Sequence, residues 1–476
     1  MAERQTQGRG RPAVVPPLDA GFAPAVLANR VFREDVEASG RSVPTALVFD
    51  RGDAGVSRVD LAVFDAQNDA ERSRNLRYVE RWVKGLLWAR GAKRVVVAGP
   101  RAIGEAIREM YRPGGTRAFD AHMSGRMYAA PFTVDVGDVA DAPEARERTL
   151  RLGGHLDGCR IGFDLGASDR KACAVRDGEV LFSEEVPWDP KVQTDPRYHY
   201  DGIADSLKRA AAHLPRVDAI GGSAAGAYVH NEPRVASLFM SIPDAVFDRE
   251  IRPLFARLRA DWGNVPFEVL NDGDVTALAG SLSLGESPLL GIAMGSSEAA
   301  GYVNPDGCFM GWNNELAFVP IDGNPEAPVD AWSGDRGCGA QYFSQEAVGR
   351  LAGPAGIELD PAAHLAERLV DVQALMDRGD PRARAIFETI GVYFGYGIAH
   401  YADFYDLRRV LFLGRVSSGP GGVRILEMAQ HVLATEFPEL AERVTVSLPD
   451  EKSRRVGQSI AAASLPELPA RERSGS

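Results

Sequence analysis

The stretch CRIGFDLGASDRK, from Cys159 to Lys171, places a polar turn directly after an apolar strand. An apolar run followed by a turn glycine predicts a buried strand that enters a hairpin. Within it, Asp164, Gly166 and Ser168 form a D-x-G-x-S turn whose backbone N–H groups and hydroxyl suit phosphate oxygens, while the carboxylate suits a hydrated Mg²⁺. A glycine after a strand is also typical of an ordinary hairpin, so this stretch alone leaves a phosphate site and a structural turn both open.

Strands and helices alternate on both sides of this hairpin. After it, the sequence predicts a helix over 203–213 and the strand VDAIGGS; before it, TALVFD, SRVDLAVFD, a helix over 70–90 and RVVVAG give the same order. This alternation predicts an α/β fold. The likeness of the two series fits either a degenerate internal copy or the general similarity of βαβ units. Residues 1–150 show no pair of short helices joined by a tight turn, so a DNA-binding head is not expected.

Composition and charge limit the classes of partner. The 476 residues are 45% hydrophobic and 25% charged, which is typical of a soluble globular chain. With 54 Lys and Arg against 66 Asp and Glu, the net charge of −12 repels nucleic-acid backbones and anionic lipid, so we expect no nucleic-acid and no membrane partner. The start of the chain carries charge and proline where a signal peptide needs an apolar segment, which predicts a cytoplasmic protein. The four cysteines form no C-x-x-C pair, so neither a disulfide framework nor a structural zinc site is expected.

A second motif, Asn271-Asp272-Gly273-Asp274, follows the apolar strand FEVL and opens a helix-like segment. A carboxylate at the carboxyl end of a strand lies at the crevice where α/β sheets bind ligands, and it can accept the proton of an attacking hydroxyl. Asn and Asp are also preferred helix N-caps, so a capping role is equally open. Of the two aspartates, we assign the base to Asp272 and the cap to Asp274.

Two further glycine turns follow apolar strands. Gly295, Ser296 and Ser297 lie between two strand-like runs and offer amides and hydroxyls to a second group of phosphate oxygens. Gly414 ends a buried strand before a helix, where the turn allows an adenine or ribose to approach the backbone closely. Each turn, taken alone, is an ordinary hairpin or strand-to-helix turn.

Taken together and in this order, the motifs resemble those of the sugar kinase, hexokinase and actin superfamily, and most closely its ROK family (repressor, open reading frame, kinase). The resemblance covers roughly residues 159–466. It implies ATP and Mg²⁺ as cofactors, Asp272 as the catalytic base, and Asn271 and Glu315 as contacts to the acceptor. It also implies that Asp164 holds Mg²⁺ through water. The nucleotide-binding residues that it implies are Asp164, Gly166, Ser168, Lys171, Gly295, Ser296, Ser297 and Gly414.

Two positions depart from the ROK pattern. The segment 311–318 keeps the family's glutamate as Glu315, but the histidine that contacts the sugar and ligates zinc is replaced by Phe318. In the family's cysteine cluster one cysteine remains, Cys338, and the sugar-contacting glutamate is replaced by Ala340. The sequence therefore predicts no zinc site, and it makes glucose or N-acetylmannosamine a less expected acceptor.

The predicted fold class is α/β: a two-lobed, ribonuclease H-like (actin and hexokinase-like ATPase) unit preceded by an N-terminal α/β extension. The expected segments are a disordered tail over 1–17, an N-terminal module over 18–154, lobe 1 over 155–275, lobe 2 over 276–466 and a disordered tail over 467–476. The junction 142–154 predicts a helix started by a proline, and thus a module that is fixed to its neighbour.

The predicted function is ATP-dependent transfer of a phosphoryl group to a hydroxyl of a sugar or cyclitol, by a protein expected to form a homodimer. Two alternatives stay open. One is a sugar-sensing regulator without turnover, since the same family includes repressors. The other is a pseudokinase scaffold, which Phe318 and Ala340 favour. The retained Asp272 and the phosphate turns favour the kinase, because phosphoryl transfer needs little more than positioning groups, Mg²⁺ and one aligned base.

Overall fold

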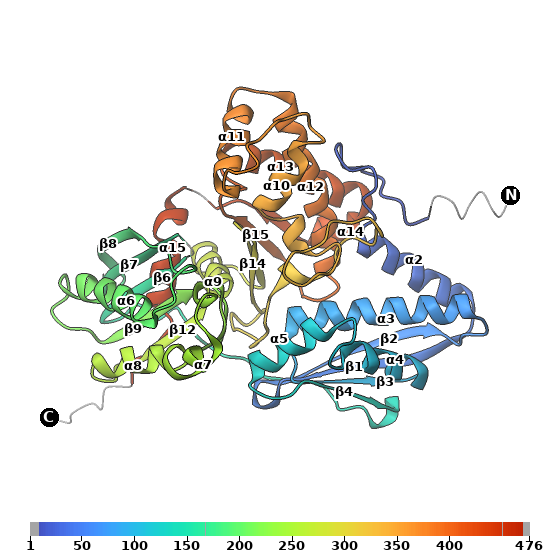
Figure 1. Cartoon of the computed structure of the whole chain (residues 1–476), viewed down its shortest axis with the longest axis horizontal. Helices are drawn as coiled ribbons and strands as arrows, with labels where there is room; N and C mark the ends of the chain where they lie inside the picture. Colours follow the sequence, from blue (N-terminus) through green and yellow to red (C-terminus); the bar gives the residue numbers. More distant parts are fainter. Residues whose placement is uncertain (1–8, 167, 450, 470–476) are drawn as a thin grey trace.

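The computed structural model describes residues 9–166, 168–449 and 451–469, with only the backbone described for 451–456. Within these residues the chain forms four β-sheets. Three of them, one each in the N-terminal module, lobe 1 and lobe 2, carry the architecture (Figure 1). The fourth is a short hairpin, β10 (Ala227–Val229) and β11 (Glu232–Val235).

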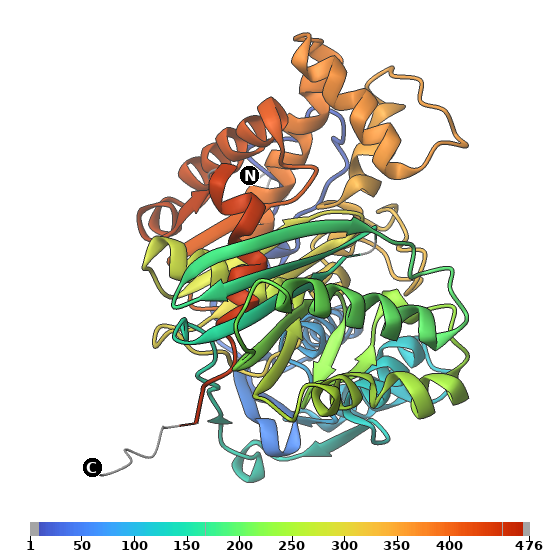
Figure 2. The same cartoon turned by 90° about the vertical axis from the view of Figure 1, so that its left-hand side faces the viewer.

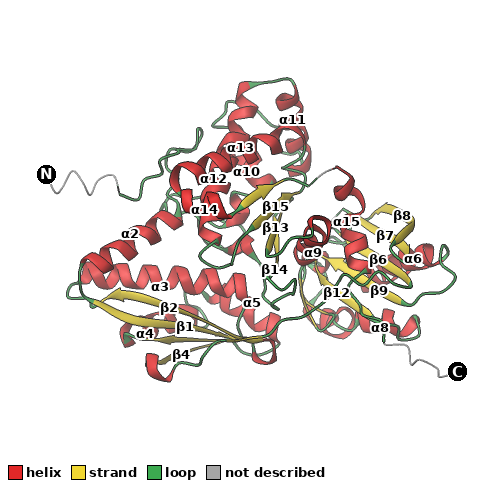
Figure 3. Ribbon diagram, turned by 180° about the vertical axis from the view of Figure 1, so that it is seen from behind, coloured by secondary structure: helices red, strands yellow, loops and turns green. Residues whose placement is uncertain are grey.

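The N-terminal module is a five-stranded sheet in the order β4-β3-β1-β2-β5. Strand β1 runs antiparallel to β2 and β3, and β3 runs parallel to β4. Its strands are β1 (Ser42–Asp50), β2 (Gly55–Phe64), β3 (Arg94–Ala98), β4 (Thr133–Gly137) and β5 (Arg146–Glu147). Its helices are α2 (Ala25–Ala38), α3 (Asp69–Arg90), α4 (Arg101–Tyr111) and α5 (Ala118–Tyr128). Helix α3 lies along the side of the sheet that faces lobe 2 (Figures 1 and 3).

Helix α3 begins after a capping asparagine and ends at a glycine, residue types that favour helix ends. The Asn68 side chain caps it by accepting the Glu71 N–H at 2.9 Å, and Gly91 ends it with a φ of 81°. Every residue of 78–89 except Arg81 is buried. A helix buried all round must pack on two sides. One side of α3 covers the module sheet, and the other reaches lobe 2.

Lobe 1 is a five-stranded sheet in the order β12-β9-β6-β7-β8. Strands β6, β9 and β12 are parallel to one another, and β7 runs antiparallel to both of its neighbours, β6 and β8. Its strands are β6 (Cys159–Leu165), β7 (Asp169–Arg176), β8 (Glu179–Pro187), β9 (Ala219–Ala224) and β12 (Phe267–Asn271). Its helices are α6 (Pro196–Ala211), α7 (Asp244–Val246) and α8 (Leu254–Asp261). Alternate residues of β6, Ile161 and Phe163, pack toward α6 and α8, which cover the outer face (Figure 2).

Lobe 2 has a four-stranded sheet in the order β14-β13-β15-β16. Its strands are β13 (Leu289–Met294), β14 (Glu298–Val303), β15 (Arg409–Leu413) and β16 (Thr445–Ser447). Its helices are α10 (Gln345–Ala352), α11 (Leu365–Asp377), α12 (Pro381–Tyr401), α13 (Gly419–Glu436) and α14 (Pro438–Arg443). Helix α12 is buried along most of its length. No helix of the described ranges is long and apolar enough to cross a membrane.

Two helices lie at the junction of the lobes and differ from the expected domain division. Helix α9 (Asp272–Leu284) starts at the end of β12 in lobe 1 but packs on β13 and β14 of lobe 2, so the expected boundary at 275 falls inside it. Helix α15 (Glu451–Ala463), expected in lobe 2, packs on the lobe 1 sheet instead. It approaches so closely that a Cβ on Gly221 would collide with the Ala462 carbonyl.

One hydrophobic core crosses from the N-terminal module into lobe 2. Leu47 of β1, Val83 of α3 and Phe394 of α12 belong to the same cluster of buried side chains, and the Trp82 ring lies 5.5 Å from that of Phe404. Lobe 1 has a core of its own. The predicted fold class, a two-lobed α/β unit with an N-terminal α/β extension, is confirmed.

The junction and the first tail differ from expectation. The junction holds no helix: the Leu150 N–H donates to the Phe309 carbonyl at 2.8 Å, and this extended pairing satisfies backbone groups that a helix would otherwise satisfy. In the expected N-terminal tail, Arg9 pairs with Glu34 and Asp35 of α2. Further along, the Val14 N–H donates to the Tyr396 hydroxyl of lobe 2 at 3.3 Å. The remaining parts of the two expected tails, 1–8 and 470–476, lie outside the described residues.

Removing residues 1–150 is expected to expose the lobe 2 side of the shared core. Because apolar surface costs free energy when water reaches it, the 151–476 fragment should aggregate or melt well below the full chain. Size-exclusion chromatography and thermal unfolding of both proteins measure this. A monodisperse fragment with an unchanged melting temperature would show that the module is an independent attachment.

Candidate functional site

Three parallel strands of lobe 1 end side by side at one edge of the sheet. Asp164 near the end of β6 pairs in register with Ser223 of β9, and Ala224 pairs with Asn271 of β12. The Ser223 hydroxyl donates to Asp164 Oδ1 at 2.6 Å. The carboxyl edge of such a sheet is where α/β folds bind ligands. The structure therefore brings the first two sequence motifs together.

The glycine turns of lobe 2 meet the first turn of lobe 1. An added Cβ on Gly414 would lie 2.5 Å from the Met294 carbonyl oxygen, and the Val416 N–H donates to that same oxygen at 3.1 Å, so the turns after β13 and β15 are in direct contact. From the second of these turns, Arg415 donates to the Ser168 hydroxyl at 3.3 Å. All three predicted phosphate and nucleotide turns thus border one region between the lobes.

Lys171 on β7 carries positive charge into this region. Its Nζ lies 3.1 Å from Asp169 Oδ1 and 3.8 Å from Asp164 Oδ2. Burial lowers the pKa of Lys171, but the charges of Asp164 and Asp169 raise it by more than burial lowers it. The net shift is upward, and the side chain stays cationic. Burial raises the pKa of Asp164, against the opposing effects of Lys171 and Ser223.

The three glycine turns fit a nucleoside triphosphate and a magnesium ion held mainly by water. Ser296 and Ser297 are exposed, so their hydroxyls are accessible to phosphate oxygens. No group of three or more His, Cys, Asp or Glu side chains in the described ranges is placed to hold a metal ion. Mg²⁺ commonly binds through one or two carboxylates together with water and substrate phosphates. Asp164 is the carboxylate that fits this mode.

Asp272 is the half-buried first residue of α9 and the predicted base. Burial, and secondly the charge of Asp164, raises its pKa to about 6. The cap of α9 differs from the prediction, because Asn271 and not Asp274 is the N-cap: its side chain accepts the Gly273 N–H at 2.7 Å. The Asn271 side chain also donates to the Gly226 carbonyl at 2.8 Å, so both of its polar ends have partners within the protein.

The Glu315 loop lies against the start of α9. Asn314 donates to Asp274 Oδ1 at 2.9 Å, which connects the loop to the helix. Burial, with the charge of Asp272 and against the Asn314 hydrogen bond, raises the pKa of Asp274 to about 7. Burial, and secondly the charge of Asp272, raises the pKa of Glu315 to about 8. The predicted base and the predicted acceptor contact, Glu315, are therefore neighbours.

Sequence reasoning missed several residues of this region. They are Ser223, Asp274 as a site residue, Glu298, Asn314 and Arg415. Asp274 had a usable signal, since it occupies the last position of the N-D-x-N motif. The others had none, because their contacts join segments far apart in the chain.

The C-terminal end of α3, in the N-terminal module, holds the Glu315 loop directly. The Asn314 N–H donates to the Ala89 carbonyl at 2.9 Å, and the Glu315 N–H donates to the Trp88 carbonyl at 3.1 Å. The last carbonyls of a helix have no partner inside the helix, so they are available to accept such bonds. The module thus supports a residue of the candidate site.

Phe318, at the position of the ROK histidine, is part of the same contact. Its ring lies 4.1 Å from that of Trp88. The Phe318 ring also packs near Phe119 and Trp332. An aromatic cluster between α3, α5 and the 316–332 region therefore occupies the place where the family pattern puts a polar ligand.

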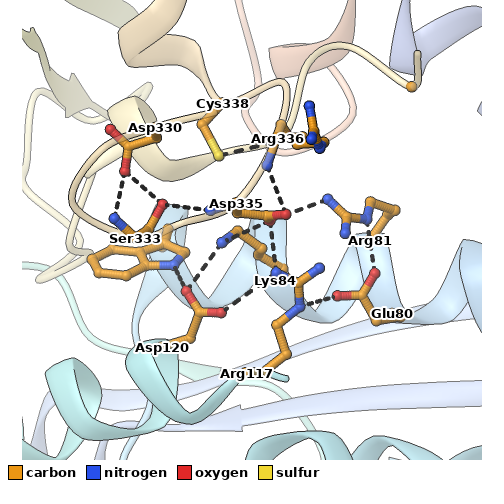
Figure 4. Close-up of polar contacts among 12 residues, drawn as sticks. Glu80, Arg81, Lys84, Arg117, Asp120, Asp330, Ser333, Asp335, Arg336 and Cys338 are labelled. Carbon is orange, nitrogen blue, oxygen red and sulfur yellow. Dashed lines mark hydrogen bonds and ion pairs between the residues drawn. The ribbon is translucent and has the colours of Figure 1, made fainter. Parts of the chain in front are cut away.

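A buried ionic network fixes Asp335, further along the chain from Phe318, to the module (Figure 4). Lys84 of α3 is fully buried, and its Nζ lies 3.0 Å from Asp335 and 3.1 Å from Asp120. Arg117 lies 2.7 Å from Asp335 and Arg81 3.3 Å from it. Burial raises the pKa of Asp335, but these three cations lower it far more, so the net shift is well below the usual range. The loop that carries Cys338 is thus held by charge pairs with the module.

Comparison with known proteins agrees with this architecture. No family model matches the chain. The sequence is 25% identical to a glucokinase of Halalkalibacterium halodurans over 300 residues, 59% of this chain and 87% of the glucokinase. A solved ROK family transcriptional regulator, a homologue of the E. coli MLC protein, has a TM-score of 0.52 at 17% identity, over 65% of this chain and 79% of that one. A ROK family glucokinase from Streptomyces griseus, in complex with glucose and AMPPNP, has a TM-score of 0.47 at 22% identity, over 64% of this chain and 99% of that one.

Replacing Lys84 by Met is expected to destabilise the protein, because it removes a buried cation from Asp335 and Asp120. Removing one partner of a buried ionic contact costs about 3 kcal/mol or more. Urea unfolding measures the loss. The matched control is Arg72→Met on the same helix, whose exposed ion pair with Asp69 should contribute less than about 1 kcal/mol. Equal stability of the two variants would contradict the role given to the network.

Proposed function

We propose that this chain, which has the fold of the ROK family over about two thirds of its length, transfers the γ-phosphoryl group of ATP to a hydroxyl of a sugar or sugar-like molecule. The observation that carries the proposal is the place of Asp272, half-buried at the head of α9 and beside the Glu315 loop. A carboxyl group whose pKa is about 6 is well matched to accept a proton near neutral pH. The similarity to a bacterial glucokinase supports the same class of reaction.

The roles of the residues follow from their positions. Bound ATP with Mg²⁺ would supply an electrophilic γ-phosphorus. Asp272 accepts the proton of the acceptor hydroxyl as that oxygen bonds to the γ-phosphorus, the bond from the phosphorus to the β–γ bridging oxygen breaks, and ADP and a phosphate monoester result. Lys171, Ser296 and Ser297 bind phosphoryl oxygens, and Glu315 orients the acceptor.

A sugar-binding regulator without turnover is the second candidate, because the solved structure with a TM-score of 0.52 is a ROK transcriptional regulator. ADP release from ATP and Mg²⁺, measured across hexoses, amino sugars, ketoses and cyclitols, separates the two. Acceptor-dependent ADP release supports the kinase. Binding of a sugar without any ADP release supports the regulator. The homodimer and the cytoplasmic location expected from the sequence remain predictions.

Asp272→Asn is expected to lower kcat by at least about 100-fold, because a general base acts in the transition state. The affinity for ATP should stay within about twofold, since the base does not bind the nucleotide. The matched control is Asp371→Asn, at an exposed aspartate of α11. Steady-state kinetics and calorimetric titration with ATP measure both quantities. A variant with turnover close to that of the wild type would exclude Asp272 as the base.

The pH dependence of kcat/KM should report the raised pKa of this carboxyl group. Asp272 must be ionised to accept a proton, so activity is full above its pKa and falls about tenfold per pH unit below it. With a pKa of about 6, the fall begins near pH 6, in a region where an ordinary aspartate would still be fully ionised. The nearby charge of Asp164 contributes to this raised value. A profile that stays flat down to pH 5 would contradict this environment.

A further inference from the structure

Helix α5 of the N-terminal module is fixed to α3 by buried polar contacts. Its Asp120 Oδ1 accepts the Trp88 Nε1–H at 2.7 Å and lies 3.1 Å from Lys84 Nζ. The Ser124 hydroxyl donates to the Ala92 carbonyl, just beyond the end of α3. Polar groups that are buried and paired hold two elements in one arrangement. Helices α3 and α5 therefore form one rigid part of the module.

Another side of α5 contacts lobe 1. The helix packs on both strands of the β10–β11 hairpin, at the end of the module that lies nearest to lobe 1 (Figures 1 and 3). Nearby, Arg126 Nη2 lies 3.5 Å from Asp244 Oδ1, and the Arg126 guanidinium lies 5.7 Å from the centre of the Phe247 ring. A guanidinium over an aromatic face is attracted to it, and Phe247 belongs to the buried core of lobe 1. The module thus contacts lobe 1 as well as lobe 2.

The hairpin that α5 contacts is bound to the strand that carries the proposed base. The Asn271 side chain, at the end of β12, donates to the carbonyl of Gly226, directly before β10, at 2.8 Å. In the turn of the hairpin, Asn231 donates to the Phe267 carbonyl at 2.9 Å and accepts the Val269 N–H at 2.7 Å. The hairpin is therefore attached to β12 at both of its ends. Since β12 leads directly into the proposed base, the hairpin and the base belong to one rigid part of lobe 1.

The C-terminal end of α5 contacts the loop of the proposed acceptor contact in lobe 2. The Tyr128 hydroxyl donates to Asn313 Oδ1 at 3.3 Å, and Asn313 Nδ2 lies 3.2 Å from Met127 Sδ. Gly91 leaves room for this contact: its φ is 81°, and a Cβ there would collide with the Tyr128 hydroxyl and the Asn313 side chain. Asn313 lies two residues before Glu315. One helix of 11 residues therefore connects the β10–β11 hairpin of lobe 1 to the Glu315 loop of lobe 2.

The two contacts of α5 belong to the two halves of the proposed acceptor site. Lobe 1 supplies Asn271 and leads into the base, and lobe 2 supplies Glu315. The nucleotide turns have a link of their own between the lobes, the hydrogen bond from Arg415 to Ser168. Groups that bind one molecule from two separate bodies must be held at a fixed separation to act together. Helix α5 supplies such a link at the acceptor side.

We propose that α5 links the two lobes at the acceptor site, and that its Arg126 and Tyr128 are positioning residues that set the separation of Asp272 from Glu315. This proposal rests on the proposed kinase function and adds to it two residues from outside the ROK-like part of the chain. Neither side chain takes part in the chemistry. The link holds the acceptor-binding groups in place before the acceptor arrives, so less free energy of binding is lost to ordering them.

The first experiment measures the separation of the lobes in the full-length chain without any substrate. Spin labels are attached to Asp201→Cys on α6 and Asp371→Cys on α11, two exposed positions, while the four native cysteines are buried. Double electron–electron resonance gives the distance between them. In this background Arg126→Glu should broaden the distribution of distances, because its carboxylate repels Asp244. Adding Asp244→Arg restores a pair of opposite charges and should narrow the distribution again.

The second experiment measures steady-state kinetics with D-glucose and with the acceptor of highest turnover in the ADP-release screen. Arg126→Glu should raise the KM for the acceptor about threefold or more, an effect of the size expected for a charge pair near the surface. Its KM for ATP should stay within about twofold, because the nucleotide turns keep the link through Arg415. The charge-swapped pair with Asp244→Arg should restore the KM for the acceptor. A variant that had lost its fold would raise both KM values.

Two further variants test the other contact of α5 and serve as control. Tyr128→Phe keeps the ring and removes the hydrogen bond to Asn313, so it should raise the KM for the acceptor in the same direction and leave the KM for ATP unchanged. The matched control is Arg112→Glu, at an exposed arginine of the same module whose ion pair is with Glu109. It should leave the distance distribution and both KM values unchanged.

The outcomes separate this proposal from the kinase itself. An unchanged distance distribution in Arg126→Glu would overturn the α5 link and leave the kinase standing. A broadened distribution with an unchanged KM for the acceptor would overturn the positioning role. A broadened distribution in a protein that releases no ADP with any acceptor would overturn the kinase and support the link between the lobes.

Discussion

The close approach of α9 to the lobe 2 sheet is the contact on which the site depends. A Cβ on Gly273 would collide with the Ala300 carbonyl, and a Cβ on Gly301 would collide with the Gly273 carbonyl. Only glycine at both positions lets the helix backbone lie against β14. Because Asp272 directly precedes this contact and directly follows β12, one peptide segment carries the lobe 1 strand edge to the lobe 2 sheet. The proposed base is held at the junction by packing of the main chain.

The N-terminal module acts as part of the same unit. Its α3 gives two carbonyl oxygens to the amides of Asn314 and Glu315, and its Lys84 holds Asp335 in a buried network. The aromatic contact of Trp88 with Phe318 lies between these two attachments. The loop that departs from the ROK pattern is therefore the loop that the module holds. Packing and charge pairs with the module thus fix this loop.

The electrostatics of the site follow from the same geometry. Strand edges and glycine turns place Lys171 and Arg415 on one side, and the start of α9 places Asp272 and Asp274 on the other. Enclosure then raises the pKa of these acids, because burial is the largest cause of the shift in each. The raised pKa of the proposed base thus follows from the way the two lobes and the Glu315 loop enclose the same space.

Local periodicity and turn chemistry were enough to predict the fold class, helix α3, the strand edges that carry Asp164 and Asn271, and the order of the glycine turns. The sequence misplaced the cap of α9, because Asn271 and not Asp274 accepts the Gly273 N–H. It also predicted a helix in the junction, where Leu150 instead forms an antiparallel bridge with Phe309. Which groups support the site and set its charge depends on contacts that form only in the folded chain. The bonds from Asn314 and Glu315 to α3, and the burial of Glu298 beside Gly339, join residues far apart in the chain. A backbone carbonyl accepts a hydrogen bond whatever its side chain, so such contacts leave no pattern in the sequence.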